Sequence, residues 1–305
     1  MRIRARIIGF ALVLATLGSS ARAGAAPQAA AGKSRIVNSV GFVMGNIGGK
    51  GPYWFLIDTG ANRSALDSKV ARDLGLLTAG SSSVEGSAGR VAVEHALVPR
   101  LQIGSARVRD LRPTVYDLSG SLAPQGTNVA GILGIDALGR NAVMWDNVHK
   151  RVMIGPTAAK LASLRGAAIV PFVLDNHIPR VTARIDGMQV SLRIDTGAAI
   201  GDGPTTFVNV TQAAYDQLRA RDPSLMPYTH LTATGVGGEI RIPVVKAHAL
   251  TLGRATVTEP HLIVQQPVGY FGRPDAMGFL GGYSFKRWRG FIVDYVNHRL
   301  ILLPR

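Results

Sequence analysis

An internal repeat is the feature that most limits how this 305-residue chain can fold. The segments 54–61 and 191–198 each run from an apolar stretch into the four residues Asp-Thr-Gly-Ala. The two aspartates of these segments, Asp58 and Asp195, are separated by 137 positions. Because a repeated pattern indicates that one structural unit occurs twice, we expect two related lobes.

Three further landmarks follow the repeated segment in the same order in both copies. They are a glycine-rich hairpin, an apolar-apolar-glycine element and a closing strand, at 85–89, 131–134 and 145–154 in the first copy and at 234–238, 278–281 and 293–302 in the second. The spacing changes mainly through an insertion of 12 residues in the second copy, part of which is 201–204. Length changes that fall in loops are typical of a duplicated domain.

The chain between these landmarks favours strands over helices. Short runs rich in Val and Ile alternate with Gly, Pro and Asn, a pattern that predicts an all-β fold. Each copy has one helical pattern, at 66–74 and at 213–218, the second with Thr211 as its N-cap. The predicted units are an N-terminal lobe at 34–156, a linker at 157–165 that could form a short helix, and a C-terminal lobe at 166–305.

The first 23 residues have the pattern of a signal peptide. Three arginines precede the apolar run 7–17, and Ala21-Arg22-Ala23 offers the small residues of a cleavage site. The apolar run is too short to span a membrane. We therefore expect a signal peptide at 1–23, a flexible leader at 24–33 and no membrane anchor after the signal is removed.

The chain contains no cysteine. This excludes disulfides, thiolate metal sites and a cysteine nucleophile. Export without disulfides suits a bacterial periplasm better than a eukaryotic secretory route, so the expected location is periplasmic or secreted.

The formal net charge of the chain is +15, and removal of the four arginines in the predicted signal peptide leaves +11. A charge of this size can attract nucleic acid, anionic lipid or acidic polymers. The basic residues are dispersed, however, with no run of five and no interleaved aromatic patch. The composition therefore favours a basic solvated surface over a nucleic-acid site.

The two Asp-Thr-Gly loops can together form a catalytic pair. An apolar strand holds each carboxylate in place, and the glycine after it permits a tight turn. Two carboxylates brought within a few ångströms cannot both ionise easily, so they share one proton. The ionised group can then activate a water molecule while the protonated group donates to a carbonyl. The candidate catalytic residues are Asp58 and Asp195, supported by Thr59, Gly60, Thr196 and Gly197.

These paired loops and their companion elements resemble the aspartic protease superfamily. The local motifs are similar to those of retropepsins, which carry one such unit per chain and dimerise, whereas two units in one chain resemble the pepsin-like bilobal arrangement. The resemblance implies a periplasmic aspartyl protease of bacterial type, with two retropepsin-like β-barrel lobes forming a pseudo-dimer around a central cleft. It implies an endopeptidase that acts on extended peptides or unfolded proteins as a monomer, without a cofactor.

By the same resemblance, the two glycine-rich hairpins would be flaps that close over an extended peptide. Neither hairpin offers the tyrosine of pepsin-like flaps, and ordinary glycine hairpins remain the alternative. The proposed flap residues are Gly86, Gly89, Gly235 and Gly238.

The residue after each Asp-Thr-Gly bears on the pH range of activity. Pepsin-like enzymes commonly have Ser or Thr there, and its hydroxyl bonds the carboxylate. Here both copies have alanine, Ala61 and Ala198, as retropepsins do. Since a hydrogen bond to the ionised form lowers a carboxyl pKa, its absence predicts an activity maximum at mildly acidic pH, about 5 to 6.

Two other classes of function remain open at this point. One is a catalytically silent module that holds a peptide in the same cleft, and the other is a basic envelope protein that binds an anionic polymer. Retention of Asp-Thr-Gly in both copies favours the enzyme. The seven histidines have no metal-ligand spacing, and no nucleophile elbow or phosphate loop occurs.

Overall fold

The structure, a computed structural model, describes residues 33–305 apart from 87–88, 105, 121–122, 201–202 and 236–237. The predicted signal peptide and almost all of the leader lie outside the described residues. Strands dominate the described chain and are joined by short helices and turns, which confirms the all-β prediction. Within this part of the chain, no helix is long and apolar enough to cross a membrane.

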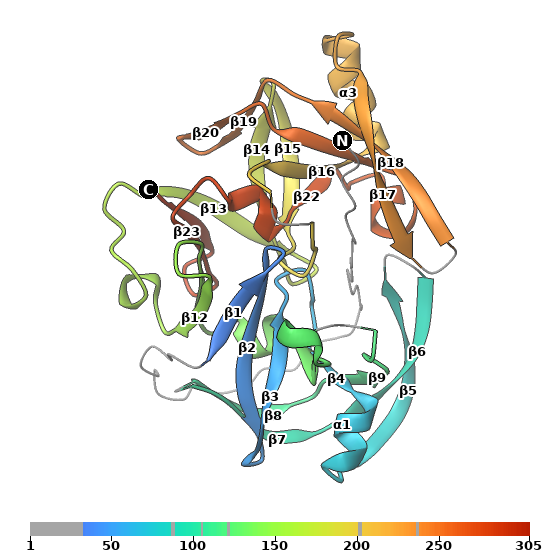
Figure 1. The fold of residues 1–305 in the computed structure, drawn as a ribbon, viewed down its shortest axis with the longest axis vertical. Coiled ribbons are helices and arrows are strands. Elements are labelled where there is room, and N and C mark those ends of the chain that lie inside the picture. Colours follow the sequence, from blue (N-terminus) through green and yellow to red (C-terminus); the bar gives the residue numbers. More distant parts are fainter. Residues whose placement is uncertain (1–32, 87–88, 105, 121–122, 201–202, 236–237) are drawn as a thin grey trace.

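The strands that precede position 134 form one sheet, in the spatial order β5-β6-β9-β4-β10-β3-β2-β7-β8, with β1 paired to β2. In Figure 1 these blue and cyan elements fill the lower half of the view. Their bounds are β1 Ser34–Val37, β2 Val40–Ile47, β3 Lys50–Ile57, β4 Ala65–Asp67, β5 Thr78–Gly86, β6 Gly89–Ala96, β7 Val98–Ile103, β8 Ala106–Leu111, β9 Thr114–Tyr116 and β10 Gly131–Leu133.

The remaining strands form a second sheet, in the order β12-β11-β23-β24-β13-β14-β15-β22-β16-β21-β18-β17, with β19 paired to β14 and β20 to β19. Their bounds are β11 Ala142–Asp146, β12 Arg151–Gly155, β13 Ala168–Asp175, β14 Ile178–Ile185, β15 Met188–Ile194, β16 Phe207–Thr211, β17 Pro227–Gly235, β18 Gly238–Lys246, β19 Ala249–Leu252, β20 Ala255–Thr258, β21 His261–Gln265, β22 Gly278–Leu280, β23 Gly290–Asp294 and β24 Arg299–Leu303.

Both copies build the same core around the strand that leads to the aspartate. In the first copy β10 lies parallel to β3, and in the second β22 lies parallel to β15. Each aspartate continues this pairing, since the Asp58 N–H donates to the Leu133 carbonyl (3.0 Å) and the Asp195 N–H to the Leu280 carbonyl (2.8 Å). The apolar-apolar-glycine element of each copy therefore fixes where the Asp-Thr-Gly loop begins.

The helices begin where a side chain caps them. α1 (Ser68–Asp73) follows Asp67, whose carboxylate accepts from two backbone N–H groups of the first turn. The sequence pattern had the helix begin at Leu66, but that residue belongs to β4 and pairs with Gly131. In α3 (Gln212–Arg221) the predicted cap is confirmed, because the Thr211 hydroxyl accepts from the Ala214 N–H.

The other helical elements are single turns. They are α2 Ile135–Leu138 and the 3₁₀ turns η1 Pro124–Gly126, η2 Ala158–Lys160, η3 Gly269–Gly272 and η4 Gly282–Phe285. One of them, η2, lies in the segment predicted to link the two copies, where the sequence indicated a short helix.

One part of the second sheet, formed by β12, β11, β23, β24 and β13, joins the two copies, and we call it the central sheet. The closing strands of both copies pair antiparallel, β11 with β23, so that Met144 lies opposite Ile292. Trp145 of β11 stacks on Phe291 of β23 with ring centroids 4.8 Å apart, and both side chains are fully buried. Strands β11 and β12, which the predicted boundary places in the N-terminal lobe, thus belong to a sheet with C-terminal strands: β11 pairs with β23, and β12 pairs with β11 at the edge. The lobe boundaries themselves remain predictions.

Candidate active site

The two Asp-Thr-Gly loops meet where the two halves of the chain face each other. Each follows a strand whose last residue is fully buried, Ile57 in β3 and Ile194 in β15. The side chains of Asp58 and Asp195 are themselves almost completely buried, with exposed fractions of 1% and 4%. Residues that the sequence separates by 137 positions therefore share one enclosed site.

The two threonines hold the loops together through reciprocal hydrogen bonds. The Thr59 N–H donates to the Thr196 hydroxyl (3.1 Å), and the Thr196 N–H donates to the Thr59 hydroxyl (3.2 Å). Each hydroxyl then donates to a strand carbonyl of the opposite copy, Thr59 to Ile194 (2.7 Å) and Thr196 to Ile57 (3.1 Å). Four buried bonds between the copies therefore set the distance between the loops.

The two carboxyl groups lie against each other, and the glycines make this possible. A Cβ atom on Gly60 would lie 2.6 Å from the Asp195 Cγ, and one on Gly197 would lie 2.5 Å from the Asp58 Cγ. Such contacts are shorter than packed atoms tolerate, so only glycine fits at either position. The Gly197 N–H lies within hydrogen-bond distance of both carboxyl groups, 3.2 Å from Asp58 Oδ1 and 3.1 Å from Asp195 Oδ1. The predicted support residues are all brought to the site.

Burial controls the ionisation of the pair. Loss of water around the carboxyl, followed by repulsion from Asp195, raises the pKa of Asp58 well above its usual value. Burial also raises the pKa of Asp195, to about 6. Two neighbouring carboxyls that resist ionisation hold one proton between them over a range of pH.

The environments of the two carboxyls differ. Asp195 Oδ1 accepts from the backbone N–H groups of Gly197 (3.1 Å) and Ala198 (3.2 Å). Asp58 Oδ1 likewise accepts from two backbone N–H groups, those of Gly60 (2.7 Å) and Gly197 (3.2 Å), while the Ala61 N–H donates to the Asp58 backbone carbonyl. The number of N–H donors therefore does not distinguish the two carboxyls. The guanidinium of Arg193 lowers the pKa of Asp195 relative to its partner. Asp195 is therefore the member of the pair that more readily carries the negative charge.

Arg193 is a residue to which the sequence analysis assigned no role. Its signal was a charged residue inside an apolar strand, at the position where the first copy has Leu56. Strand alternation puts Arg193 on the same face as Asp195, two residues away. The structure therefore adds a buried cation to the surroundings of the pair.

Phenol groups surround the pair on other sides. Tyr116 from β9 and Tyr295, next to β23, have pKa values raised by burial and by the charge of Asp58. Tyr283 from η4 has a raised pKa for the same reasons, with Asp195 as the nearby charge, and it contacts Asn209. These tyrosines are neutral at ordinary pH and enclose the carboxyls in a medium of low polarity.

The two glycine-rich hairpins are present as long antiparallel strand pairs. Gly86 pairs with Gly89 at the end of β5 and β6, and Gly235 pairs with Gly238 at the end of β17 and β18. The tips at 87–88 and 236–237 lie outside the described residues. A role of the four glycines as flaps remains a prediction.

Three further aspartates, Asp136, Asp146 and Asp294, serve local structure. Asp136 accepts from the backbone and the hydroxyl of Ser64. Asp146 and Asp294 each accept from residues of the hairpin turn that follows them, His149 and Asn297 among others. No group of three or more possible His, Asp or Glu metal ligands occurs among the described residues.

The chain was compared with known protein families and structures. Residues 43–137, which include the first Asp-Thr-Gly loop, match the family described as aspartyl protease. Among curated proteins no relative matches the chain. A solved retropepsin-like aspartic protease from Rickettsia conorii is 18% identical over 45% of this chain and 89% of its own, with a TM-score of 0.30. The family match shows that the segment carrying the first Asp-Thr-Gly loop is similar to aspartyl proteases.

Proposed function

We propose that the protein is an aspartic endopeptidase that cleaves extended peptides or unfolded proteins with water activated by Asp58 and Asp195. The observation that carries the proposal is the pair itself, two buried carboxyl groups within reach of the same Gly197 N–H, on loops that are hydrogen-bonded to each other. Burying two acids in contact is costly for folding. Their enclosure in one site is the arrangement that general acid–base chemistry requires.

The asymmetry of the pair suggests which group plays which part. Asp195, whose pKa the nearby Arg193 lowers relative to that of Asp58, begins the reaction ionised, and Asp58 begins it protonated. Asp195 takes a proton from water as the water oxygen attacks the peptide carbonyl carbon. Asp58 gives its proton to the carbonyl oxygen, which yields a neutral tetrahedral intermediate.

Collapse of this intermediate reverses the proton movements. The carbonyl re-forms as its hydroxyl proton returns to Asp58, and Asp195 delivers its proton to the leaving nitrogen. The C–N bond breaks and an acid and an amine result, with the pair back in its starting state. No covalent bond to the protein forms at any stage, which is why the site needs no nucleophilic Ser or Cys.

The test of this function is the loss of cleavage when either acid becomes an amide. We expect Asp58→Asn and Asp195→Asn each to lower the cleavage of a denatured protein mixture at least about a thousandfold, because general acid–base catalysis needs both groups. Cleaved bonds are mapped by mass spectrometry of the products. Asn retains the Oδ1 acceptor, so both variants should keep the native circular dichroism spectrum.

A variant that keeps near-normal turnover would contradict the assignment of its aspartate. A wild-type protein that binds unfolded chains but cuts none would instead indicate the silent peptide-binding module. Capture of anionic polymers that salt abolishes, without any cleavage, would indicate the basic envelope protein.

We also propose that the protein acts outside the cytoplasm as a monomer, without a membrane anchor and without a cofactor. The basis for the location outside the cytoplasm is the signal-peptide pattern of residues 1–23. Expression of the full chain in a bacterial host should give a periplasmic or secreted product whose N-terminus lies near Gly24. N-terminal sequencing of the fractionated product checks this, and a cytoplasmic protein that still begins at Met1 would refute it.

A further inference from the structure

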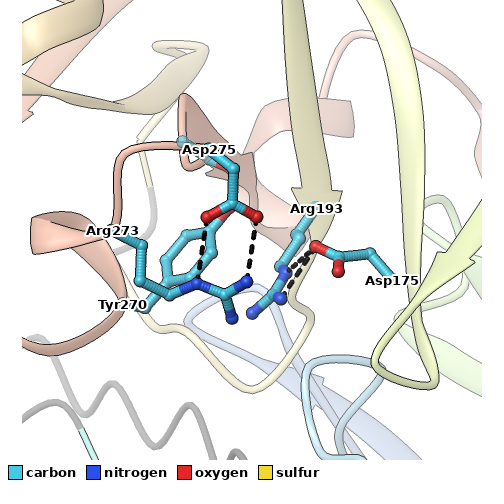
Figure 2. Close-up of polar contacts among 6 residues, drawn as sticks. Asp175, Arg193, Tyr270, Arg273 and Asp275 are labelled. Carbon is cyan, nitrogen blue, oxygen red and sulfur yellow. Dashed lines mark hydrogen bonds and ion pairs between the residues drawn. The ribbon is translucent and has the colours of Figure 1, made fainter.

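A cluster of charged and aromatic side chains lies beside Asp195. Figure 2 shows this arginine cluster, in which Arg193 and Arg273 each pair with an aspartate and a tyrosine ring lies by Arg193. Three parts of the chain contribute, namely β13, β15 and the segment between β21 and β22. Its members are Asp175, Arg193, Tyr270, Arg273 and Asp275.

Arg193 is the buried centre of this arginine cluster. Its side chain is 3% exposed, and its Nε and Nη2 both donate to Asp175 Oδ2 at 3.0 and 2.8 Å. The ring of Tyr270 covers the guanidinium at 4.2 Å from its centroid. The remaining nitrogen, Nη1, is buried and has no hydrogen-bond partner. A buried donor without an acceptor is unfavourable, and a bound acceptor would relieve that cost.

The first copy has an apolar surface at the corresponding place. Leu56 stands two residues before Asp58, as Arg193 stands two residues before Asp195. Val37 pairs with Val40 at the end of its hairpin, as Asp175 pairs with Ile178. Leu56 and Val37 both pack on an apolar cluster. A peptide lying across the two aspartates would thus meet an apolar wall on one side and Arg193 on the other.

The charges of the cluster indicate which acceptor would fit. Two guanidinium groups are matched by two carboxylates, since Arg273 donates through Nε and Nη2 to Asp275. A further carboxylate would add negative charge close to both Asp175 and Asp195. A neutral oxygen would satisfy Nη1 without that repulsion.

We propose that Arg193 forms a polar subsite next to the catalytic pair and binds the side-chain amide oxygen of a substrate Gln or Asn beside the cleaved bond. This inference rests on the proposed function. The amide oxygen accepts from Nη1 of Arg193, and the Tyr270 ring packs against the stem of the bound side chain. Because Nη1 has no exposed surface, binding requires η3, which carries Tyr270, to shift. Val268 and Gly272, two positions to either side of Tyr270, are exposed, and the shift would break the bond that the Tyr270 hydroxyl donates to the Gly278 carbonyl (3.2 Å).

Matched peptides test the inference. A cleaved peptide is prepared with Gln, Met or Glu at each of the two positions that flank the cut bond, Met being close to Gln in shape without the amide. We expect wild-type kcat/KM to favour Gln over Met and over Glu by about five- to tenfold at one position only, the gain of one hydrogen bond.

The variant Asp175→Val/Arg193→Leu gives the second copy the residues of the first and leaves no carboxylate unpaired. It should lose the preference for Gln and favour Met. Arg151→Leu is the matched control, since Arg151 also donates through Nε to an aspartate, Asp146, but lies in the central sheet. This control should keep the wild-type preference. If the double variant does not fold, Arg193→Lys, which keeps a positive charge beside Asp175 but lacks the Nη1 donor, should also lose the preference for Gln.

Binding separates this inference from the proposed function. Fluorescence anisotropy measures the affinity of the Asp58→Asn protein for labelled Gln and Met peptides without any cleavage. A wild-type protein that prefers to bind Gln peptides but cuts none would refute the protease function and leave the subsite intact. Equal binding and turnover of Gln and Met peptides in the wild type would overturn the subsite. So would a preference for Glu, or a Gln preference that survives in the double variant.

Discussion

At the residue scale, the chemistry of the site depends on burial. Asp58 and Asp195 occupy the ends of ordinary strands, yet their carboxyls have lost nearly all contact with water. This loss raises both pKa values, and the contact between the groups raises that of Asp58 further. A single proton therefore stays on the pair under conditions in which exposed aspartates would both be ionised.

This burial predicts the pH dependence of activity. The active form holds one proton, so activity falls on the acid side as Asp195 gains a proton, with a pKa of about 6. It falls on the alkaline side as Asp58, whose pKa is raised further, loses its proton. We expect a bell-shaped profile with its maximum at or above about pH 6 and a loss of about tenfold per pH unit below the acid midpoint.

The expected pH of maximum activity lies above the range of pH 5 to 6 that the two alanines suggest. The missing hydroxyl raises the carboxyl pKa values, and the burial of both groups raises them further. Around the pair, Tyr116, Tyr283 and Tyr295 have raised pKa values and stay neutral over this range, so these phenols add no titration. Initial rates from pH 3 to 9, corrected for stability, give the profile. A maximum at pH 2 to 3 would refute the argument from burial.

At the element scale, the two loops act as a cross-link between the copies. Each loop is a tight turn after a buried strand, and each offers one threonine hydroxyl to the other loop's backbone. The hydroxyls also reach the strands that carry the aspartates, at Ile57 and Ile194. The separation of the carboxyls thus depends on bonds that neither copy can form alone.

Substitution of one threonine tests this cross-link. Thr196→Val keeps the shape of the side chain but leaves the Thr59 N–H and the Ile57 carbonyl buried without partners. Each unpaired group costs about 1–3 kcal/mol, so we expect a loss of at least about 2 kcal/mol in the free energy of unfolding. Cleavage should fall as well, because the carboxyls are no longer held together.

The control for this prediction is Thr196→Ser, which retains the hydroxyl and should keep most of the stability and activity. Urea unfolding and initial rates on the same preparations measure both effects. Equal losses in the Ser and Val variants would show that the methyl group, and not the cross-link, matters.

At the scale of the whole molecule, the central sheet makes the two copies one folding unit. β11 and β12 from the first copy lie beside β23, β24 and β13 from the second. The Trp145–Phe291 stack lies within this joint sheet. Because both half-sites and their connecting strands belong to one polypeptide, no second chain is needed to complete the pair.

We therefore expect the protein to be active as a monomer. Specific activity should stay constant over a thousandfold dilution, and sedimentation should give the mass of one chain over the same range. A loss of specific activity that follows a change from dimer to monomer would refute this expectation. An engineered chain cut between the copies, within 157–165, serves as the control whose activity does depend on concentration.

Much of this architecture was readable from the residues alone. The repeated Asp-Thr-Gly-Ala segments predicted two related units, and the alternation of Val and Ile runs with turns predicted strands. The Thr211 cap was also predictable, because capping depends on residues a few positions apart. The helix at 66–74 was predicted too long because Leu66 is held in β4 by Gly131, a partner that no local pattern reveals.

What only the tertiary structure decided are the contacts between distant residues. The pairing of β11 with β23 joins segments about 150 positions apart, and no local pattern in either strand indicates which strand it pairs with. The same holds for the bond from Arg193 to Asp175, and for the difference in surroundings that makes Asp195 the more acidic of the two carboxyls. The sequence by itself determined that two aspartates end two similar strands. Their burial, and with it their shared proton, followed only from folding, because desolvation depends on every segment that packs around them.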